Sequence, residues 1–258
     1  MDQTRSSKES SVALIRRLVG FVACLGILGV GFSVNAKDKE KEAADKTVDS
    51  GTFSVLKNGR HVATETFSVH EGSGGSTVAA QLKSDGGADS AAQASELKLS
   101  KTGDLIRYAW HEVSPGKAEL EVTPNDQFLI ERITPVPGDK ATEQPFLMPT
   151  SSIVLDNNSF VHREVLAWRY LATSCKQEDG NFLCTPAQFG VIVPQDRLSM
   201  KVSLTPVGKE KLKIKGAERE LLRLNLKDDS GEWALWLDDQ YKLMRILVAA
   251  DNTEVVRD

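Results

Sequence analysis

Residues 51–69 read GTFSVLKNGRHVATETFSV, and this stretch decides the fold class. Apolar and polar side chains alternate over residues 52–57 and again over residues 61–69, which is the pattern of half-buried β-strands. Asn58-Gly59 separates the two runs, and both residue types tolerate the positive φ angles of a two-residue turn. The stretch therefore predicts a β-hairpin.

Short alternating runs of the same kind continue along the chain. They are residues 77–83, 96–100, 104–112, 117–123, 127–134, 188–193, 199–204, 211–215, 220–226, 233–237 and 242–249. Turn-forming residues separate them, which is typical of an all-β meander, sandwich or barrel. We therefore expect residues 51–258 to be mainly β, as a curved antiparallel sheet or partial β-barrel. Prolines between residues 134 and 150 predict a break in the ladder, so the domain has possible halves at 51–134 and 150–258.

One segment, residues 158–173, has the period of an α-helix that covers the sheet. An apolar stripe recurs along it at helical spacing, formed by Val161, Val165, Trp168 and Ala172. Asn158 or Ser159 is the expected N-cap, because their side-chain oxygens can accept the first backbone N–H groups. Arg163 and Glu164 are expected to face water.

The N-terminus has the features of an export segment. Arg16-Arg17 precedes an apolar run over residues 18–34, and small residues at Val34 and Ala36 suit cleavage after Ala36. If it is retained, a run of about 17 residues is the lower limit for a membrane-spanning helix. Residues 1–36 are therefore a signal peptide or a membrane anchor. The residues around Cys24 match a lipidation site poorly, and the residues around Arg16-Arg17 match a twin-arginine export signal poorly.

Both interpretations place the rest of the chain in the periplasm or on the outer face of the inner membrane. Residues 37–50 are charged without an apolar period and are expected to form a solvated spacer. In an oxidising compartment, Cys175 and Cys184 are expected to form a disulfide across the polar turn between them. A net charge of −4, with both signs interspersed, argues against nucleic-acid binding.

No catalytic, metal-binding or phosphate-binding motif occurs in the chain, so we expect neither a cofactor nor a metal. The histidines are scattered singly, at positions 61, 70, 111 and 162. A cleft joining two of Glu65, His70, His111 and Asp228 would revive an enzymatic interpretation.

Two further patterns have both a functional and a structural interpretation. Lysines alternate at Lys209, Lys211, Lys213 and Lys215. On a strand they would share one face, as a contact for anionic envelope polymers or as charge that protects an edge strand from aggregation. Trp233 and Trp236 stand three apart, so they should face opposite sides of a strand, with one in the core and the other at a rim or cavity mouth.

Two stretches together carry a resemblance. The first is residues 51–55 with Asn58-Gly59 and the return at residues 66–69, and the second is residues 236–243, WLDDQYKL. In this order, with a leader and a helix midway, they resemble uncharacterised exported bacterial proteins that form a domain of unknown function. The resemblance implies a curved antiparallel sheet similar to the half-barrels of lipoprotein carriers, and it implies no catalytic residues.

We therefore expect an exported, non-enzymatic cell-envelope protein that binds an apolar or lipid-like ligand between sheet and helix. The expected ligand contacts are Val161, Val165, Trp168, Trp233 and Trp236. The physical motive is that one helix need not fill the concave apolar face of a curved sheet. The alternative is an envelope interaction or scaffold protein that acts through its strand edges and has no small ligand; its protein partner is not predicted.

Overall fold

A single large β-sheet and one α-helix make up almost all of the regular structure. The computed structural model describes residues 45–86, 90–178, 181–229 and 231–258. Its strands are β1 Lys46–Lys57, β2 Arg60–Gly72, β3 Gly75–Ser84, β4 Ala92–Leu99, β5 Leu105–Ser114, β6 Glu119–Asn125, β7 Phe128–Thr134, β8 Thr142–Phe146, β9 Ile153–Val154, β10 Cys175–Glu178, β11 Asn181–Cys184, β12 Ala187–Val193, β13 Leu198–Ile214, β14 Ala217–Lys227, β15 Glu232–Leu237, β16 Leu243–Val248 and β17 Thr253–Arg257. The helix α1 spans Val161–Ser174, and the short 3₁₀ helices η1 and η2 span Pro194–Asp196 and Ala249–Asp251.

Fifteen strands form the sheet, in the order β8-β7-β6-β5-β4-β3-β2-β1-β17-β16-β15-β14-β13-β12-β9. The first and last strands of the described chain therefore meet inside the sheet, where β1 pairs with β17. The edges, β8 and β9, come from the middle of the chain. All neighbours are antiparallel except β9 and β12, which are parallel, so the sheet is mixed.

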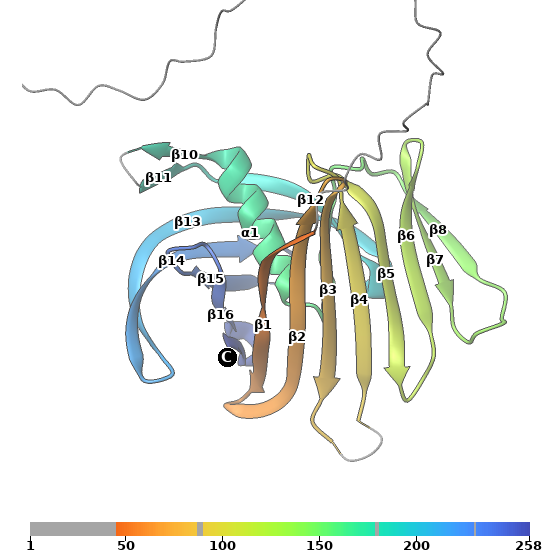
Figure 1. Cartoon of the computed structure of the whole chain (residues 1–258), viewed down its shortest axis with the longest axis horizontal. Helices are drawn as coiled ribbons and strands as arrows, with labels where there is room; N and C mark the ends of the chain where they lie inside the picture. The colour runs from red at the N-terminus through yellow and green to blue at the C-terminus, as the bar shows by residue number, and fades with distance from the viewer. Residues whose placement is uncertain (1–44, 87–89, 179–180, 230) are drawn as a thin grey trace, which may run out of the picture. The chain divides into compact units, whose positions relative to one another are not determined.

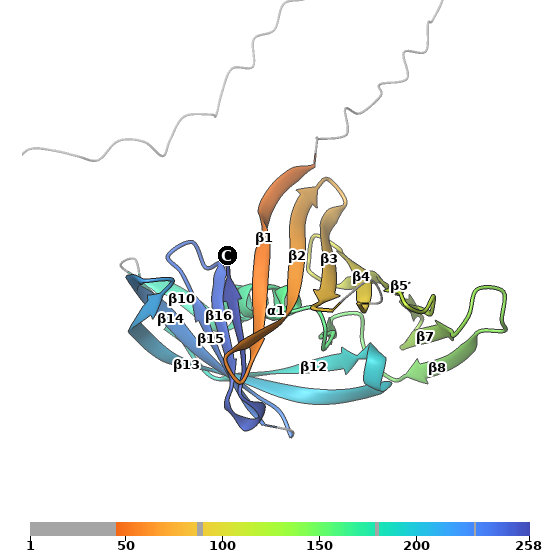
Figure 2. The ribbon, with the colours of Figure 1, turned by 90° about the horizontal axis from the view of Figure 1, so that it is seen from below.

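The sheet curls around α1 without closing into a barrel. Figures 1 and 2 show α1 between two parts of the sheet, β1–β5 and β12–β16. The strands of one part run across the direction of the strands of the other. Side chains bridge the gap near β8: Gln144 Nε2 donates to the Arg197 carbonyl at 3.0 Å, and Arg197 Nε lies 3.5 Å from Glu131 Oε2. The mainly β fold with one covering helix is thus confirmed.

Strand alternation supplies the main core on the face that surrounds α1. Phe53, Phe67, Val78 and Tyr108 are at most 3% exposed on this face, and Phe53 stacks on Phe67 with ring centroids 4.8 Å apart. A smaller apolar cluster lies on the opposite face of the C-terminal strands, formed by Ile214, Leu221, Ala234, Trp236 and Met244. Each buried large side chain of these clusters contributes about 1.5–3 kcal/mol of transfer free energy.

The hairpin predicted from residues 51–69 is confirmed. Asn58 and Gly59 have φ angles of 52° and 73°, as a two-residue turn of the mirror-image type requires. The predicted boundaries were less accurate. β1 begins at Lys46, inside the expected spacer 37–50, because residues 46–50 pair with the far end of β2.

The expected halves 51–134 and 150–258 are parts of one sheet. The predicted break in the ladder does lie in this segment, because β8, which holds Pro145, and β9 are the two edges of the sheet and do not pair with each other. The strands predicted at 199–204 and 211–215 are one strand, β13, which contains a register shift between Pro206 and Gly208. The predicted leader, residues 1–36, lies outside the described residues, as does most of the spacer. Within the described ranges, no helix is both long and apolar enough to cross a membrane.

Candidate functional site

A hollow of about 430 Å³ lies between α1 and strands β2 to β4. The sheet side of its wall is apolar, with Val69, Val78, Leu97 and Leu99, and β9 adds Ile153 and Val154. The helix side consists of Val165, Trp168 and Ala172, the predicted apolar stripe without Val161. The β4–β5 turn at residues 101–103 and the last turns of α1, with Arg169 and Thr173, form the mouth. Ligand pockets of this size and lining are typical for small apolar molecules.

The N-terminal end of α1 is held by a buried carboxyl from the sheet. Glu65 of β2 is fully buried, its Oε2 accepts from the Phe160 N–H at 2.9 Å, and its Oε1 accepts from Ser159 Oγ at 3.1 Å. Burial raises the pKa of Glu65 to about 8, against the lowering effect of these hydrogen bonds. The expected cap by Asn158 or Ser159 is therefore wrong. No side chain of the helix segment caps it, because Glu65 takes that position and Ser159 donates to Glu65.

A second group of buried polar residues surrounds the same end of the helix. Tyr108 donates to Asp156 Oδ2 at 2.5 Å, and Arg163 Nη1 donates to the carbonyl oxygens of Asp156 and Ser159. Burial raises the pKa of Asp156 and lowers that of Arg163 to about 10. Arg163 is 2% exposed and its guanidinium carbon lies 4.6 Å from the centroid of the Trp233 ring. The expectation that it faces water is wrong, because these acceptors replace water.

Glu164 is also buried, contrary to the prediction, and it ties the first turn of α1 to the C-terminal strands. Its Oε1 accepts from the Leu243 N–H at 3.0 Å and lies 3.6 Å from Arg257 Nη1. Burial first, and then the charge of Asp49, raises the pKa of Glu164 well above its ordinary value. Burial acts to raise the pKa of Asp49 too, but Arg257 and Lys242, at 2.7 and 2.9 Å, lower it overall.

Three further bonds fix the second half of α1. Trp168 Nε1 donates to the Tyr241 carbonyl at 2.7 Å, Arg169 Nη1 donates to the Gly103 carbonyl, and Tyr170 Oη donates to the Thr185 carbonyl at 3.0 Å. The helix is thus held by polar contacts along its whole length. These contacts set its position above β2–β4, with the hollow beside Val165 left between helix and sheet.

The predicted ligand contacts divide between this hollow and other places. Val165 and Trp168 line it. Val161 is fully buried in the core, and Trp233 packs under Arg163 near the other end of the helix. Trp236 is on the opposite face of the sheet, 4% exposed, with its Nε1 donating to Glu210 Oε2 at 2.9 Å. The two tryptophans do face opposite sides of the sheet, but neither lines the hollow.

The lysines of β13 form no continuous cationic ridge. Lys209, Lys211 and Lys213 share one exposed face, beyond the pairing with β12 that ends at Leu204. However, Lys209 Nζ lies 3.7 Å from Glu220, and Lys213 is opposite Glu218 on β14. Lys215 is not on the strand: its φ of 48° places it in the turn, where Nζ contacts Asp258 at 2.8 Å. This arrangement fits the charged edge better than an anion contact.

The four residues singled out for an enzymatic interpretation occupy separate places. Glu65 is at the start of α1, and His70 lies 3.3 Å from Thr47 Oγ1 near the far end of β2. His111 is on β5, beside Trp110. Asp228 accepts from the Gly231 N–H at 2.9 Å in the β14–β15 turn. His162 is fully buried, and burial lowers its pKa to about 3.

A hydroxyl–imidazole–carboxylate series that the sequence did not suggest lies on the surface. His61 Nδ1 is 2.7 Å from Asp85 Oδ2, and its Nε2 is 3.3 Å from Thr64 Oγ1. The side chains of His61 and Asp85 are 39% and 53% exposed, and neither lines the hollow. We therefore interpret the group as a surface hydrogen-bond network.

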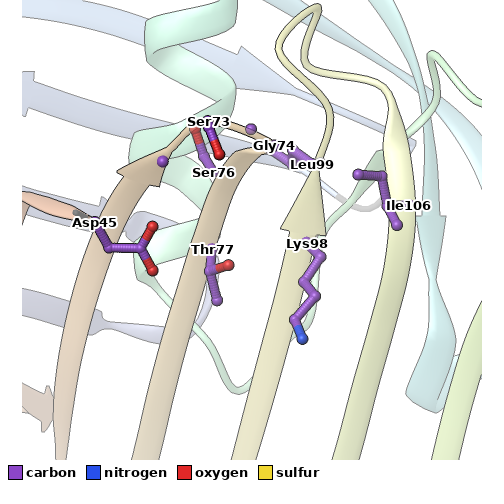
Figure 3. A pocket seen from close by; sticks show the side chains of 10 residues that line it. Asp45, Ser73, Gly74, Ser76, Thr77, Lys98, Leu99 and Ile106 are labelled. Atoms are coloured by element: carbon purple, nitrogen blue, oxygen red, sulfur yellow. The ribbon is translucent and has the colours of Figure 1, made fainter. Parts of the chain in front are cut away.

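A second hollow, of about 550 Å³, lies on the outer side of the sheet near the β2–β3 turn (Figure 3). Thr77 and Lys98 line it, and each alternates with a core residue, Val78 and Leu97, that points toward α1. Asp45, Ser73 and Ser76 complete a mostly polar lining (Figure 3). Leu99 and Ile106 are its apolar members (Figure 3), so it has less apolar lining than the hollow beside α1.

The cysteines predicted to pair do form a disulfide. Cys175 and Cys184 stand opposite each other in the β10–β11 hairpin, which follows α1 directly. The bond therefore holds together the two strands that extend the C-terminal end of the helix.

The sequence reasoning missed the buried carboxyls that hold α1. Strand alternation could have found Glu65, because it shares a face with Ala63, Phe67 and Val69, which are core residues. Asp49 alternates in the same way with Phe53, and Arg257 with Val255. Glu164 gave no such signal, since the Leu243 N–H that it accepts from is 79 residues away.

Comparison with known proteins adds evidence on the fold. Neither a protein-family model nor a curated protein matches the chain. A solved structure does match: a β-barrel-like protein of the domain of unknown function DUF1849 from Brucella abortus. The match covers 81% of this chain and 94% of that chain, with a TM-score of 0.51 and 6% sequence identity. The chain is thus similar in fold to a β-rich domain of unknown function.

Proposed function

We propose that this protein is an exported, non-enzymatic binding protein of the cell envelope, and that it holds the apolar part of a lipid-like molecule beside α1. The hollow of about 430 Å³ between Val165, Trp168 and the β2–β4 wall is the observation that carries the proposal. An apolar chain that enters it exchanges water for apolar side chains on both sides.

The way α1 is held supports a preformed site. A helix held only by apolar contacts would settle onto the sheet, because close packing is favoured. Here Glu65, Glu164 and Trp168 fix its height through directional bonds to distant strands. A preformed site spares a ligand the cost of ordering the protein on binding.

The disulfide supports the proposed compartment. Cys175 and Cys184 are joined, and disulfides persist in oxidising compartments such as the periplasm. Amino-terminal sequencing of the protein recovered from the envelope fraction tests export and cleavage together. A product that begins at residue 37 is expected, or an intact leader if the segment stays as an anchor. Recovery in the cytoplasm alone would contradict the proposal.

Binding is tested with the full chain and a neutral fluorescent probe, N-phenylnaphthylamine, displaced by a series of straight-chain alcohols. Each buried methylene should contribute about 0.8 kcal/mol, which is about fourfold in affinity, until the chain fills the hollow. Native mass spectrometry after mild purification should show a co-purified amphiphile. Absence of binding for every chain length would overturn the proposal.

The site is located by contact quenching with a bromine-labelled alcohol. Because Trp168 lines the hollow, Trp168→Phe should remove most of the quenching. Trp236→Phe is the matched control, because it makes the same substitution at a tryptophan on the opposite face of the sheet. Equal quenching in both variants would place the ligand elsewhere.

The free sheet edge favours the alternative, an interaction protein. β8 is an outermost strand, and Leu147, which follows it, is 72% exposed. If this edge is the working surface, Leu147→Asp should abolish co-elution of one envelope protein, and Val165→Phe should leave that co-elution intact.

A further inference from the structure

The mouth of the hollow has a charge pattern that selects among lipid-like ligands. Four charged residues stand at or beside it: Glu71, Lys101, Asp104 and Arg169. Arg169 donates to the Gly103 carbonyl, and its Nη2 lies 3.9 Å from Asp104 Oδ1, so its charge is largely balanced. Glu71 is opposite Lys46 in the β1–β2 register, which gives it a cationic cross-strand neighbour.

Lys101 has no such partner. Among the residues that the structure describes, no ion pair or side-chain hydrogen bond involves it, and its side chain is exposed at the mouth. Two neighbouring hydroxyls are already engaged: Thr102 Oγ1 donates to Asp104 Oδ2 at 2.7 Å, and Thr173 Oγ1 donates to the Arg169 carbonyl at 2.8 Å. The ammonium group of Lys101 is therefore an exposed cation at the entrance that no described side chain balances.

The turn that carries Lys101 is well ordered, so the charge has a defined position. Ser100 Oγ accepts from the backbone N–H groups of Thr102 and Asp104, and Arg169 ties the turn to α1. The C-terminal end of α1 contributes partial negative charge nearby. Two of its carbonyls, those of Arg169 and Ser174, already accept hydrogen bonds, which limits that effect.

We infer that the ligand is an amphiphile with an anionic head, a carboxylate or a phosphate, which Lys101 binds at the mouth while the apolar chain lies along Val165 and Trp168. The inference rests on the proposed function, since it assigns the head group of the molecule held in the same hollow. It deepens that function by naming the chemistry that distinguishes one lipid-like molecule from another.

The test compares four amphiphiles with the same saturated chain, by displacement of N-phenylnaphthylamine from the full chain at low ionic strength. They are tetradecanol, tetradecanoate, tetradecyl phosphate and tetradecyltrimethylammonium. The two anions should bind about three- to fivefold more tightly than tetradecanol, the range of one partly exposed ion pair, and the ammonium should bind more weakly. Added salt should reduce the advantage of the anions.

Lys101→Met should remove that advantage, so that the two anions bind no more tightly than tetradecanol. Lys98→Met is the matched control: it removes a lysine three residues earlier on the same strand and turn, but Lys98 lines the outer hollow and pairs with Glu96 at 3.1 Å (Figure 3). It should keep the advantage. Tighter binding of the phosphate points to a phospholipid-type head, and tighter binding of the carboxylate points to a fatty acid.

The outcomes separate the two proposals. If tetradecanol and the anions bind equally, or if Lys101→Met weakens all four amphiphiles alike, the inference about the head group is overturned while the hollow remains a binding site. If tetradecanol does not bind at all, the proposed function itself fails.

Discussion

Two valines one turn apart on α1 allow the hollow to be tested by a single pair of substitutions. Val161 is fully buried in the core, whereas Val165 lines the hollow. Val161→Phe and Val165→Phe make the same chemical change, and valine and phenylalanine have similar helix propensities, so propensity cancels in the comparison. Only the space around each side chain differs.

The magnitudes follow from that space. At Val161 the larger ring must displace close-packed neighbours, which costs about 1–3 kcal/mol. An apolar cavity of about 150 Å³ accommodates benzene, and the hollow beside Val165 is about 430 Å³. A phenyl ring at 165 therefore fits without displacing its neighbours, and the change in the free energy of unfolding should stay within about 1 kcal/mol.

Urea unfolding followed by circular dichroism measures both effects. With a slope of about 2 kcal/mol per molar urea, Val161→Phe should lower the midpoint by about 0.5–1.5 M, and Val165→Phe should shift it by less than about 0.5 M. In the displacement assay the order reverses: Val165→Phe should weaken probe binding at least tenfold, because the ring fills space that the probe would use, and losing the burial of roughly two methylenes is enough for a tenfold effect. Equal destabilisation by both substitutions would refute the presence of open space beside Val165. Full probe binding by Val165→Phe would refute the assignment of that space as the binding site.

Three further outcomes follow from the contacts of α1. The pKa of Glu65 rises from 4.5 to about 8 on folding, so the folded state binds this proton more tightly and the free energy of unfolding falls as pH increases from about 4.5 to 8. Glu65→Gln should reduce that fall, measured as urea midpoints over this pH range. An unchanged dependence of the midpoint on pH would contradict the prediction. Replacing both Cys175 and Cys184 by Ser should cost about 2.5–3 kcal/mol in the same assay, since the bond closes a loop of sequence separation 9, and a loss below about 1 kcal/mol would count against it. Trp168→Asp should detach the helix, losing the Tyr241 hydrogen bond and the apolar contact together; a variant with unchanged helical signal and thermal midpoint would show that Trp168 does not hold α1.

The secondary structure was largely accessible from the pattern of residues. Alternation and the Asn58-Gly59 turn predicted the β hairpins, and the stripe at residues 161–172 predicted the helix and part of the hollow's wall. These features are local, because the period of side chains along a strand or helix is set by backbone geometry. The paired cysteines were accessible for the same reason, since their strands are joined by a short turn.

What lies opposite the helix was decided by the tertiary structure alone. Glu65 of β2 and Arg257 of β17 are far from α1 in the sequence, and Arg257 approaches Glu164 from the strand that pairs with β1 inside the sheet. Glu164 looked like a surface residue because its partners are distant in sequence, whereas Arg163 is buried against nearby carbonyls and the Trp233 ring. The position of the helix, and therefore the space left beside Val165, depends on these long-range contacts. The local sequence pattern predicts which side chains are buried in an apolar environment. Only the assembled sheet determines how much space between helix and sheet those side chains leave unfilled.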